Sequence, residues 1–280
     1  MTSDLDERLA DWRPEPRTRH DVLTAGPVAA LSAVLDQPAA AAEGDPLPPL
    51  WHWLYFLDWP PQAELGVDGH PAVGHFLPPI PDRRRMFAGG RLRVHRPLTV
   101  GERAEQVATL ASAVVKRGRT GEMVFVTVRS EFCQRAETCL VEELDYVYRS
   151  GEDARRSFTA AGAPVPSSEA AWQLVPRISP TLLFRFSALT ANAHRIHYDA
   201  PYARGTEGYP GLVVHGPLLV LLMLELVRRT DSRSVAEVDF RLRRPVFAGD
   251  GVLARGGPDG RLAIATSVDE RHATAEVRFA

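Results

Sequence analysis

The sequence contains little cysteine. Only Cys133 and Cys139 occur in 280 residues, and they do not form a CxxC pair. Two thiols without such spacing exclude a disulfide framework and a cysteine metal site. Because free thiols suit a reducing compartment, we expect a cytoplasmic protein.

Long apolar runs and a surplus of either charge are also missing. The most apolar stretch, LLVLLML at 218–224, is too short to span a bilayer, and the acidic segment MTSDLDERLADW at the start does not resemble a signal peptide. With 33 basic and 35 acidic residues, the net charge is only −2. No global field therefore attracts nucleic acid or an anionic membrane, and we expect neither as a partner.

The chain does contain enough apolar residues for a core, 45% of the total, and an internal repeat. The segment RLRVHRPLTVGE at 91–102 precedes a similar segment, DFRLRRPVFAGD at 239–250, by 148 residues. The matched positions are Arg93 with Arg241, Arg96 with Arg244, Pro97 with Pro245, Gly101 with Gly249 and Glu102 with Asp250. The repeat indicates two copies of one structural unit.

Each copy predicts antiparallel strands. Alternating apolar residues that lead to Arg-Pro and then to a Gly-acid turn indicate a strand entering a hairpin. At the C-terminus, Ala275 and Val277 should face one side of a strand, and Glu276 and Arg278 the other. Further strands are expected at 105–115, 122–132, 138–148, 262–268 and 274–280.

Helices are predicted ahead of the strands in each copy. The segments 24–36 and 181–190 are expected to be short helices, and 48–56 is expected to correspond to the longer helix at 215–229. Gly216 and Pro217 suit the start of that longer helix, and seven successive apolar residues leave no polar face along its middle. Such a helix must be covered nearly all round.

A long helix wrapped by a curved antiparallel sheet meets this demand, so we predict an α+β fold of the duplicated hot-dog type with such a helix in each half. We place the first half at 1–150, the linker at 151–170 and the second half at 171–280. The linker assignment is based on its content of Ala, Pro, Ser and charge.

Proton-handling side chains crowd the segment LTANAHRIHYDAPYA at 189–203. Two imidazoles three residues apart and a nearby carboxylate suggest a metal, but zinc usually has three or four protein ligands. Without cysteine pairs or HExxH, the other candidates are His52 and His215, and we expect no metal. A polar surface loop is the competing interpretation. Against it, the segment leads to the start of the 215–229 helix, where backbone N–H groups are unpaired, and the first copy has no counterpart.

The segment FSALTANAHRIHYDAPYARGTEGYPGLVVHGPLL at 186–219 resembles the hydratase motif of the MaoC-like enoyl-thioester hydratases and dehydratases. It is most similar to the subgroup with mesaconyl-C4-CoA hydratase and the mitochondrial-type hydroxyacyl-thioester dehydratases. The resemblance extends to 46–57, 76–98 and 121–132. It implies a hydro-lyase that adds water reversibly to an enoyl thioester, without a cofactor beyond the CoA or acyl-carrier thioester itself.

The resemblance also implies catalytic residues. The family's catalytic His falls on His197 and its Asp on Asn192, which cannot take a proton as a carboxylate would. His197 would transfer protons, Asn192 would fix the water, and the Gly216 N–H would polarise the thioester carbonyl. His194 and Asp199 are alternative proton-transfer groups.

Several further residues are expected to contact the substrate. They are His194, Arg195, Tyr198 and His215 near the motif, and Arg85, Gly89 and Gly90 in the arginine-rich segment 82–91. Packing is the competing role for Tyr198, and solvated surface charge is the competing role for the arginines. Arginine would suit the phosphates of CoA or a second substrate carboxylate.

Three functions follow from these expectations. The first is hydration of an enoyl-CoA, with a dicarboxylic acyl-CoA such as mesaconyl-C4-CoA as one candidate substrate. The alternatives are an acyl-CoA thioesterase on the same fold and a non-catalytic acyl-thioester binding subunit. A homodimer is compatible with the fold, because hot-dog sheets commonly pair.

Overall fold

A computed structural model describes residues 4–81, 84–118, 121–149, 158, 162 and 164–280. Its helices are α1 (Asp4–Ala10), α2 (Ala25–Val34), α3 (Pro180–Leu189), α4 (Ala200–Gly205) and α5 (Gly216–Thr230), with 3₁₀ turns η1 (Trp51–Leu54), η2 (Gln62–Glu64) and η3 (Arg195–His197). The first-half strands are β1 (Arg17–Val22), β2 (Arg84–Val94), β3 (Arg103–Gly118), β4 (Gly121–Gln134) and β5 (Glu137–Arg149). The remaining strands are β6 (Trp172–Leu174), β7 (Val235–Leu242), β8 (Leu253–Gly256), β9 (Arg261–Ala265) and β10 (Ala273–Phe279).

The ten strands in the described part of the chain form one antiparallel sheet in the order β1-β3-β4-β5-β2-β7-β10-β9-β8-β6. β2 pairs with β7 from Gly89 opposite Arg241 to Arg93 opposite Glu237, and this pairing joins the two copies of the repeat. The strand order reads equivalently outward from this joint, as a duplicated unit requires. The α+β prediction with a large antiparallel sheet is confirmed, and so is the alternation in β10, where Ala275 and Val277 are buried and Glu276 and Arg278 are exposed.

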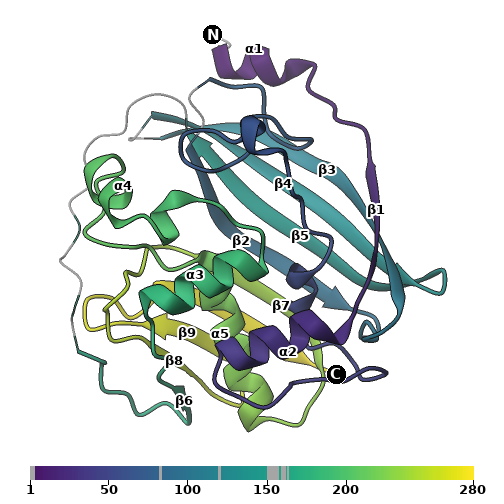
Figure 1. Cartoon of the computed structure of the whole chain (residues 1–280), viewed down its shortest axis with the longest axis vertical. Coiled ribbons are helices and arrows are strands. Elements are labelled where there is room, and N and C mark those ends of the chain that lie inside the picture. The colour runs from purple at the N-terminus through teal and green to yellow at the C-terminus, as the bar shows by residue number, and fades with distance from the viewer. Residues whose placement is uncertain (1–3, 82–83, 119–120, 150–157, 159–161, 163) are drawn as a thin grey trace.

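Helix α5 lies at the centre of the second copy. Every residue from Leu218 to Val227 is buried, and the helix contacts β6, β8, β9 and β10. α3 lies beside α2 of the first copy (Figure 1). No helix among the described residues is long and apolar enough to cross a membrane.

The first copy has no counterpart of α5 within the described residues, so the prediction of a central helix at 48–56 is wrong. Only the 3₁₀ turn Trp51–Leu54 forms there. Proline pairs at 48–49 and 60–61 close off the segment on both sides, and Leu50 and Phe56 have positive φ angles of 68° and 54°. Proline disfavours helical backbone in the residue before it, so the segment cannot extend into a long helix.

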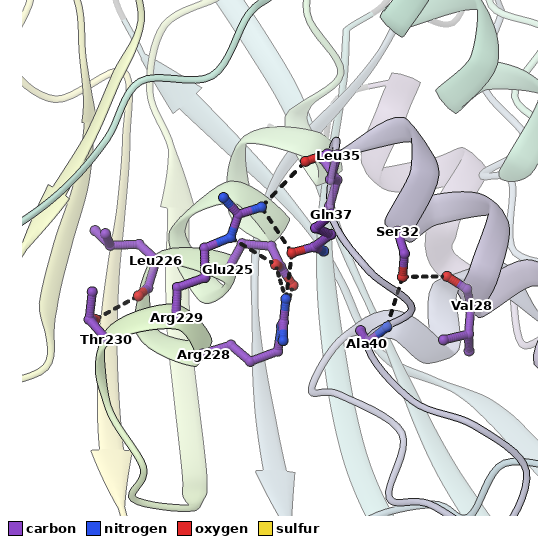
Figure 2. Close-up of polar contacts among 10 residues, drawn as sticks. All are labelled: Val28, Ser32, Leu35, Gln37, Ala40, Glu225, Leu226, Arg228, Arg229 and Thr230. Carbon is purple, nitrogen blue, oxygen red and sulfur yellow. Dashed lines mark hydrogen bonds and ion pairs between the residues drawn. The ribbon is translucent and has the colours of Figure 1, made fainter.

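The C-terminal end of α5 is tied to the first copy by polar contacts (Figure 2). The buried carboxylate of Glu225 pairs with Arg228 at 2.8 Å, and Arg229 donates to the Gln37 side chain at 2.9 Å. Gln37 follows α2, so these contacts hold α5 and α2 together. The linker predicted at 151–170 lies largely outside the described residues, and the boundary between the halves stays a prediction.

Candidate active site

The motif at 187–197 forms a turn that leads from α3 into η3. Asn192 donates its backbone N–H to the Ser187 carbonyl at 2.9 Å, and its side-chain oxygen accepts the N–H of His194 at 3.0 Å. The backbone N–H of Val213 donates a hydrogen bond of 2.9 Å to the Ile196 carbonyl. These bonds hold the motif against the chain that enters α5.

His197 is buried, and its ring is fixed by a hydrogen bond of 2.8 Å between Nδ1 and the Val213 carbonyl. Because a carbonyl only accepts, Nδ1 carries the proton and Nε2 keeps a lone pair. Burial, with the neighbouring His194, lowers the pKa of His197 to about 3. The ring is therefore neutral at physiological pH, which a base requires.

His215 lies behind His197 and supports it. The two rings stack with centroids 3.6 Å apart, and the His215 Nε2 lies 2.8 Å from the Ser187 hydroxyl oxygen. The His215 side chain is fully buried and does not line the cavity, so the structure gives it a positioning role instead of the predicted contact with substrate. Ser187, which sequence reasoning missed, is the hydroxyl group that orients it.

A cavity of about 1560 Å³ lies between the two copies. Asn192, His194, His197, Tyr198 and Gly216 all line it, so the structure brings these predicted residues together. The Gly216 N–H has no hydrogen-bond partner among the residues that the structure describes. A backbone donor at a helix start, open to a cavity, can stabilise negative charge on a carbonyl oxygen.

Two other motif residues have structural partners. Arg195 pairs with Asp199 at 2.7 Å and lies over the Tyr202 ring at 4.0 Å, outside the cavity lining. Asp199 also caps α4 by accepting the Tyr202 N–H at 3.0 Å. These contacts favour structural roles over the substrate contact predicted for Arg195 and the alternative proton role of Asp199.

The arginine-rich segment is a strand. Residues 82 and 83 lie outside the described part of the chain, and Gly89 and Gly90 are buried within β2 next to a bulge at Ala88. A Cβ on Gly89 would lie 2.5 Å from the Phe240 carbonyl oxygen, and one on Gly90 would lie 2.7 Å from that of Glu143. The two glycines thus permit close packing of the strands, instead of the flexible substrate contact that was predicted.

Arg85 does reach the cavity. Its guanidinium lies over the Tyr146 ring at 4.2 Å, and no described carboxylate forms an ion pair with it. The pKa of His194 is lowered to about 3. Burial is the largest cause, and the positive charge of Arg85 contributes to it. Arg85 is therefore a cation that shares the cavity with the motif, and among the described residues it has no carboxylate as a counter-ion.

Asp68 and His70 enter the same cavity from the first copy, and sequence reasoning missed both. The Asp68 carboxylate lies 3.0 Å from the His70 Nδ1, and the His70 and His194 rings pack with centroids 4.0 Å apart. The only local hint is GVDGHP at 66–71, where Gly and Pro indicate a tight turn that presents an acid and a histidine. Ligand atoms of Asp68, His70 and His194 lie within 4.8 Å of one another, so this trio is where a metal could be held.

Comparisons with known proteins agree with this geometry. The family model described as hydroxyacyl-thioester dehydratase type 2 matches residues 50–248. The chain is 44% identical to mesaconyl-C(4)-CoA hydratase of Chloroflexus aurantiacus, covering 93% of this chain and 98% of that protein. It is 29% identical to the mitochondrial hydroxyacyl-thioester dehydratase type 2 of Schizosaccharomyces pombe, covering 81% and 85%.

Solved structures share the fold at low identity. A MaoC-like dehydratase from Phytophthora capsici gives a TM-score of 0.66 at 12% identity, with 98% of each chain covered. HtdX of Mycobacterium tuberculosis gives 0.63 at 16% identity, with 95% of this chain and 100% of that chain covered. These likenesses support the hot-dog prediction for the fold.

Proposed function

The chain belongs to the hydroxyacyl-thioester dehydratase type 2 family, and from this premise we propose that it hydrates an enoyl-CoA whose β carbon carries a carboxylate, as in mesaconyl-C4-CoA. The enzyme is a hydro-lyase that acts on acyl thioesters. The proposed substrate class is supported by the 44% identical relative and by Arg85, a cation in the cavity with which no described carboxylate forms an ion pair.

The observation that carries the proposal is the meeting of His197 and Gly216 in one cavity. Nε2 of His197 would take a proton from water as the oxygen bonds to Cβ. The charge that moves to the thioester oxygen would be stabilised by the Gly216 N–H, a contribution of about 3 kcal/mol for one such donor. A second group must give a proton to Cα, and the Asn192 amide cannot do so.

Arg85 is the proposed partner of the substrate carboxylate. In mesaconyl-C4-CoA this carboxylate lies on the carbon that receives water, so its counter-ion must be near the catalytic histidines. Arg85 lines the same cavity as His194 and His197, and its charge acts on His194. A guanidinium binds a carboxylate through two parallel hydrogen bonds.

The test compares mesaconyl-C4-CoA with the monocarboxylic crotonyl-CoA. The purified protein should remove the conjugated enoyl-thioester absorbance without release of free thiol, with mesaconyl-C4-CoA preferred. His197→Ala should lower kcat by about 10²–10⁴-fold, whereas His95→Ala, at the exposed position that follows β2, should not. Thiol release would indicate a thioesterase, and tight binding without turnover would indicate a binding subunit.

We also propose a cytoplasmic location, supported by the free thiols of Cys133 and Cys139.

A further inference from the structure

The segment Gly66–His70 of the first copy is fixed onto the hydratase motif of the second. The Arg195 backbone N–H donates to the Asp68 carbonyl at 2.8 Å, and the Arg195 guanidinium donates to the Val67 carbonyl at 3.0 Å. Gly69 approaches so closely that a Cβ there would lie 1.9 Å from the Ala193 carbonyl oxygen. The contact is therefore specific to this pair of segments and places Asp68 and His70 at a fixed point of the cavity wall.

Asp68 orients His70 by two contacts. One carboxylate oxygen accepts the His70 backbone N–H at 3.0 Å, and the other lies 3.0 Å from Nδ1. Burial alone would raise the pKa of Asp68, but the hydrogen bonds and charge of His70 lower it to about 2. A negative charge thus lies against His70 throughout the neutral range. With Nδ1 bonded to a carboxylate, Nε2 is the ring atom left for a reactant.

His194 links this pair to His197. Its ring packs on His70 with centroids 4.0 Å apart and meets the His197 ring edge-on at 5.4 Å. The titratable groups around His70 are therefore Asp68 on its own segment and, from the motif, His194 and then His197. Arg85 of β2 adds a positive charge that acts on His194. Three imidazoles and one carboxylate line a continuous part of the cavity wall.

Asn192 occupies the position where the wider family has a carboxylate, and its amide neither gives nor takes a proton in the reaction. Its oxygen is already used by the His194 backbone N–H. The motif alone consequently supplies one oriented proton-transfer group, His197, whereas hydration moves two protons. The Asp68–His70 pair is a carboxylate-oriented histidine that lines the cavity in contact with the motif.

We propose that the first copy supplies the second proton-transfer group of the reaction, and that His70, held by Asp68, protonates Cα. This inference rests on the proposed hydratase function. Water forms a C–O bond with Cβ and loses one proton to Nε2 of His197, while the π electrons move toward Cα and the thioester oxygen. Cα then forms a C–H bond with the proton from Nε2 of His70. Return of one proton from His197 to His70 through solvent resets the site, and Asp68 stays ionised.

The test uses the whole protein with His70→Gln, Asp68→Asn and a matched control, His20→Gln. His20 is an exposed histidine whose Nδ1 lies 3.7 Å from the Glu105 carboxylate on β3. His20→Gln therefore removes a histidine–carboxylate pair that lies away from the cavity. His70→Gln should lower kcat by about 10²–10⁴-fold with KM within a few fold and an unchanged melting temperature. Asp68→Asn should lower kcat less, by about tenfold, and His20→Gln should change neither constant.

The pH profile separates a proton donor from a packing residue. A donor must be protonated, so wild-type kcat should fall at alkaline pH, and this alkaline limb should be absent in His70→Gln. In the same background, Asn192→Asp should restore about tenfold or more of kcat, because it returns a carboxylate to the motif.

Four outcomes would overturn the inference. They are a His70→Gln enzyme within threefold of wild-type kcat, a retained alkaline limb, no rescue by Asn192→Asp, and activity that is lost on dialysis against a chelator and restored by Zn²⁺, which would make the trio a metal site. A wild-type enzyme that hydrates neither substrate would instead refute the proposed function, and this inference with it.

Discussion

At the scale of single residues, the surroundings of His194, His197 and His215 keep these three imidazoles uncharged. Burial lowers the pKa values of His197 and His194 to about 3 and that of His215 well below its usual range. The hydrogen bond from Nδ1 of His197 to the Val213 carbonyl leaves Nε2 as the basic atom, and His215 stacks on the same ring. A protonated ring at His197 or His194 would lose its solvation on burial and be repelled by neighbouring positive charge, which explains why both rings are held neutral.

These depressed pKa values predict acid sensitivity. Below about pH 6.5 the unfolded chain takes up protons at these histidines that the folded protein does not, so the free energy of unfolding should fall as the pH falls. The effect is at most about 1.4 kcal/mol per histidine for each pH unit, and it continues until the pH nears the folded pKa values. Urea unfolding at pH 7.5 and 5.5 measures it. His197→Asn should reduce the slope, and equal stability at the two pH values would contradict the burial argument.

Arg85 carries the prediction about substrate choice. Arg85→Met keeps the length of the side chain and removes its charge, so KM for mesaconyl-C4-CoA should rise by about 10–100-fold, because a hydrogen bond to a charged group contributes about 1.5–3 kcal/mol. KM for crotonyl-CoA should stay within threefold. Arg93→Met, at an exposed position on the same strand, is the matched control. Equal losses on both substrates would place Arg85 at the CoA phosphates or in the general architecture.

At the scale of elements, the start of α5 positions the oxyanion donor. Gly216 has no room for a side chain, because a Cβ would lie 2.4 Å from the Leu242 Cδ1 and 3.4 Å from the Phe87 Cδ1. Gly216→Ala should therefore displace Leu242 or the helix start and lower kcat by about tenfold or more, since a misplacement of about 1 Å can cost this much.

The control for this prediction is Gly26→Ala in α2, where a Cβ would meet nothing within 4 Å. That variant should keep wild-type kcat and gain about 0.5–1 kcal/mol of stability, because alanine loses less conformational freedom than glycine in a helix. Steady-state kinetics and thermal unfolding of both variants decide the matter. Similar kinetics for the two would remove Gly216 from the catalytic account.

The elements also show how far sequence can lead. Strands β2 and β7 were predictable because Arg-Pro and a Gly-acid turn follow alternating apolar residues in both. Helix α5 was predictable because Gly216, Pro217 and an unbroken apolar run mark it locally. The prediction of a helix at 48–56 was wrong. It gave more weight to the apolar content of the segment than to the proline pairs that stop a helix there. Apolar content alone does not distinguish a buried helix from a buried irregular segment.

For the site, sequence identified what lies within one continuous motif. Asn192, His194, His197 and Gly216 are close in the chain and line the cavity together. Asp68 and His70 reach the same cavity from more than 120 residues away, and the bonds that place them are made by backbone atoms of Asp68 and Val67 with Arg195. A contact of this kind depends on packing between the copies and has no local pattern.

At the scale of the whole molecule, the two copies pack tightly against each other where Gly69 of the first copy meets the motif of the second. Gly69 has φ of 88°, and a Cβ would clash with the Ala193 carbonyl oxygen, a backbone atom that cannot move aside cheaply. Gly69→Ala should lift the 66–70 segment from the motif and lower kcat by about 100-fold through displacement of His70.

Gly44→Ala separates this clash from backbone strain. Gly44 has nearly the same φ, 89°, but open space around its Cβ position. Both variants should lose about 1 kcal/mol from the left-handed backbone conformation, but only Gly69→Ala should lose activity. Kinetics beside thermal unfolding would check this, and equal activity of the two variants would mean that the copies meet without functional consequence.

The pairing of β2 with β7 has a further consequence for how such an enzyme can diversify. In an assembly of identical subunits, each substitution appears at every symmetry-related position, so a change that helps one pocket also alters its twin. Here gene duplication has placed the two units in one reading frame, and they can vary separately. The largely irregular stretch at 55–65, which lines the cavity, could therefore be randomised in a directed-evolution library to obtain new acyl specificities, with Asp68, His70, the oxyanion donor and the base encoded elsewhere and left intact.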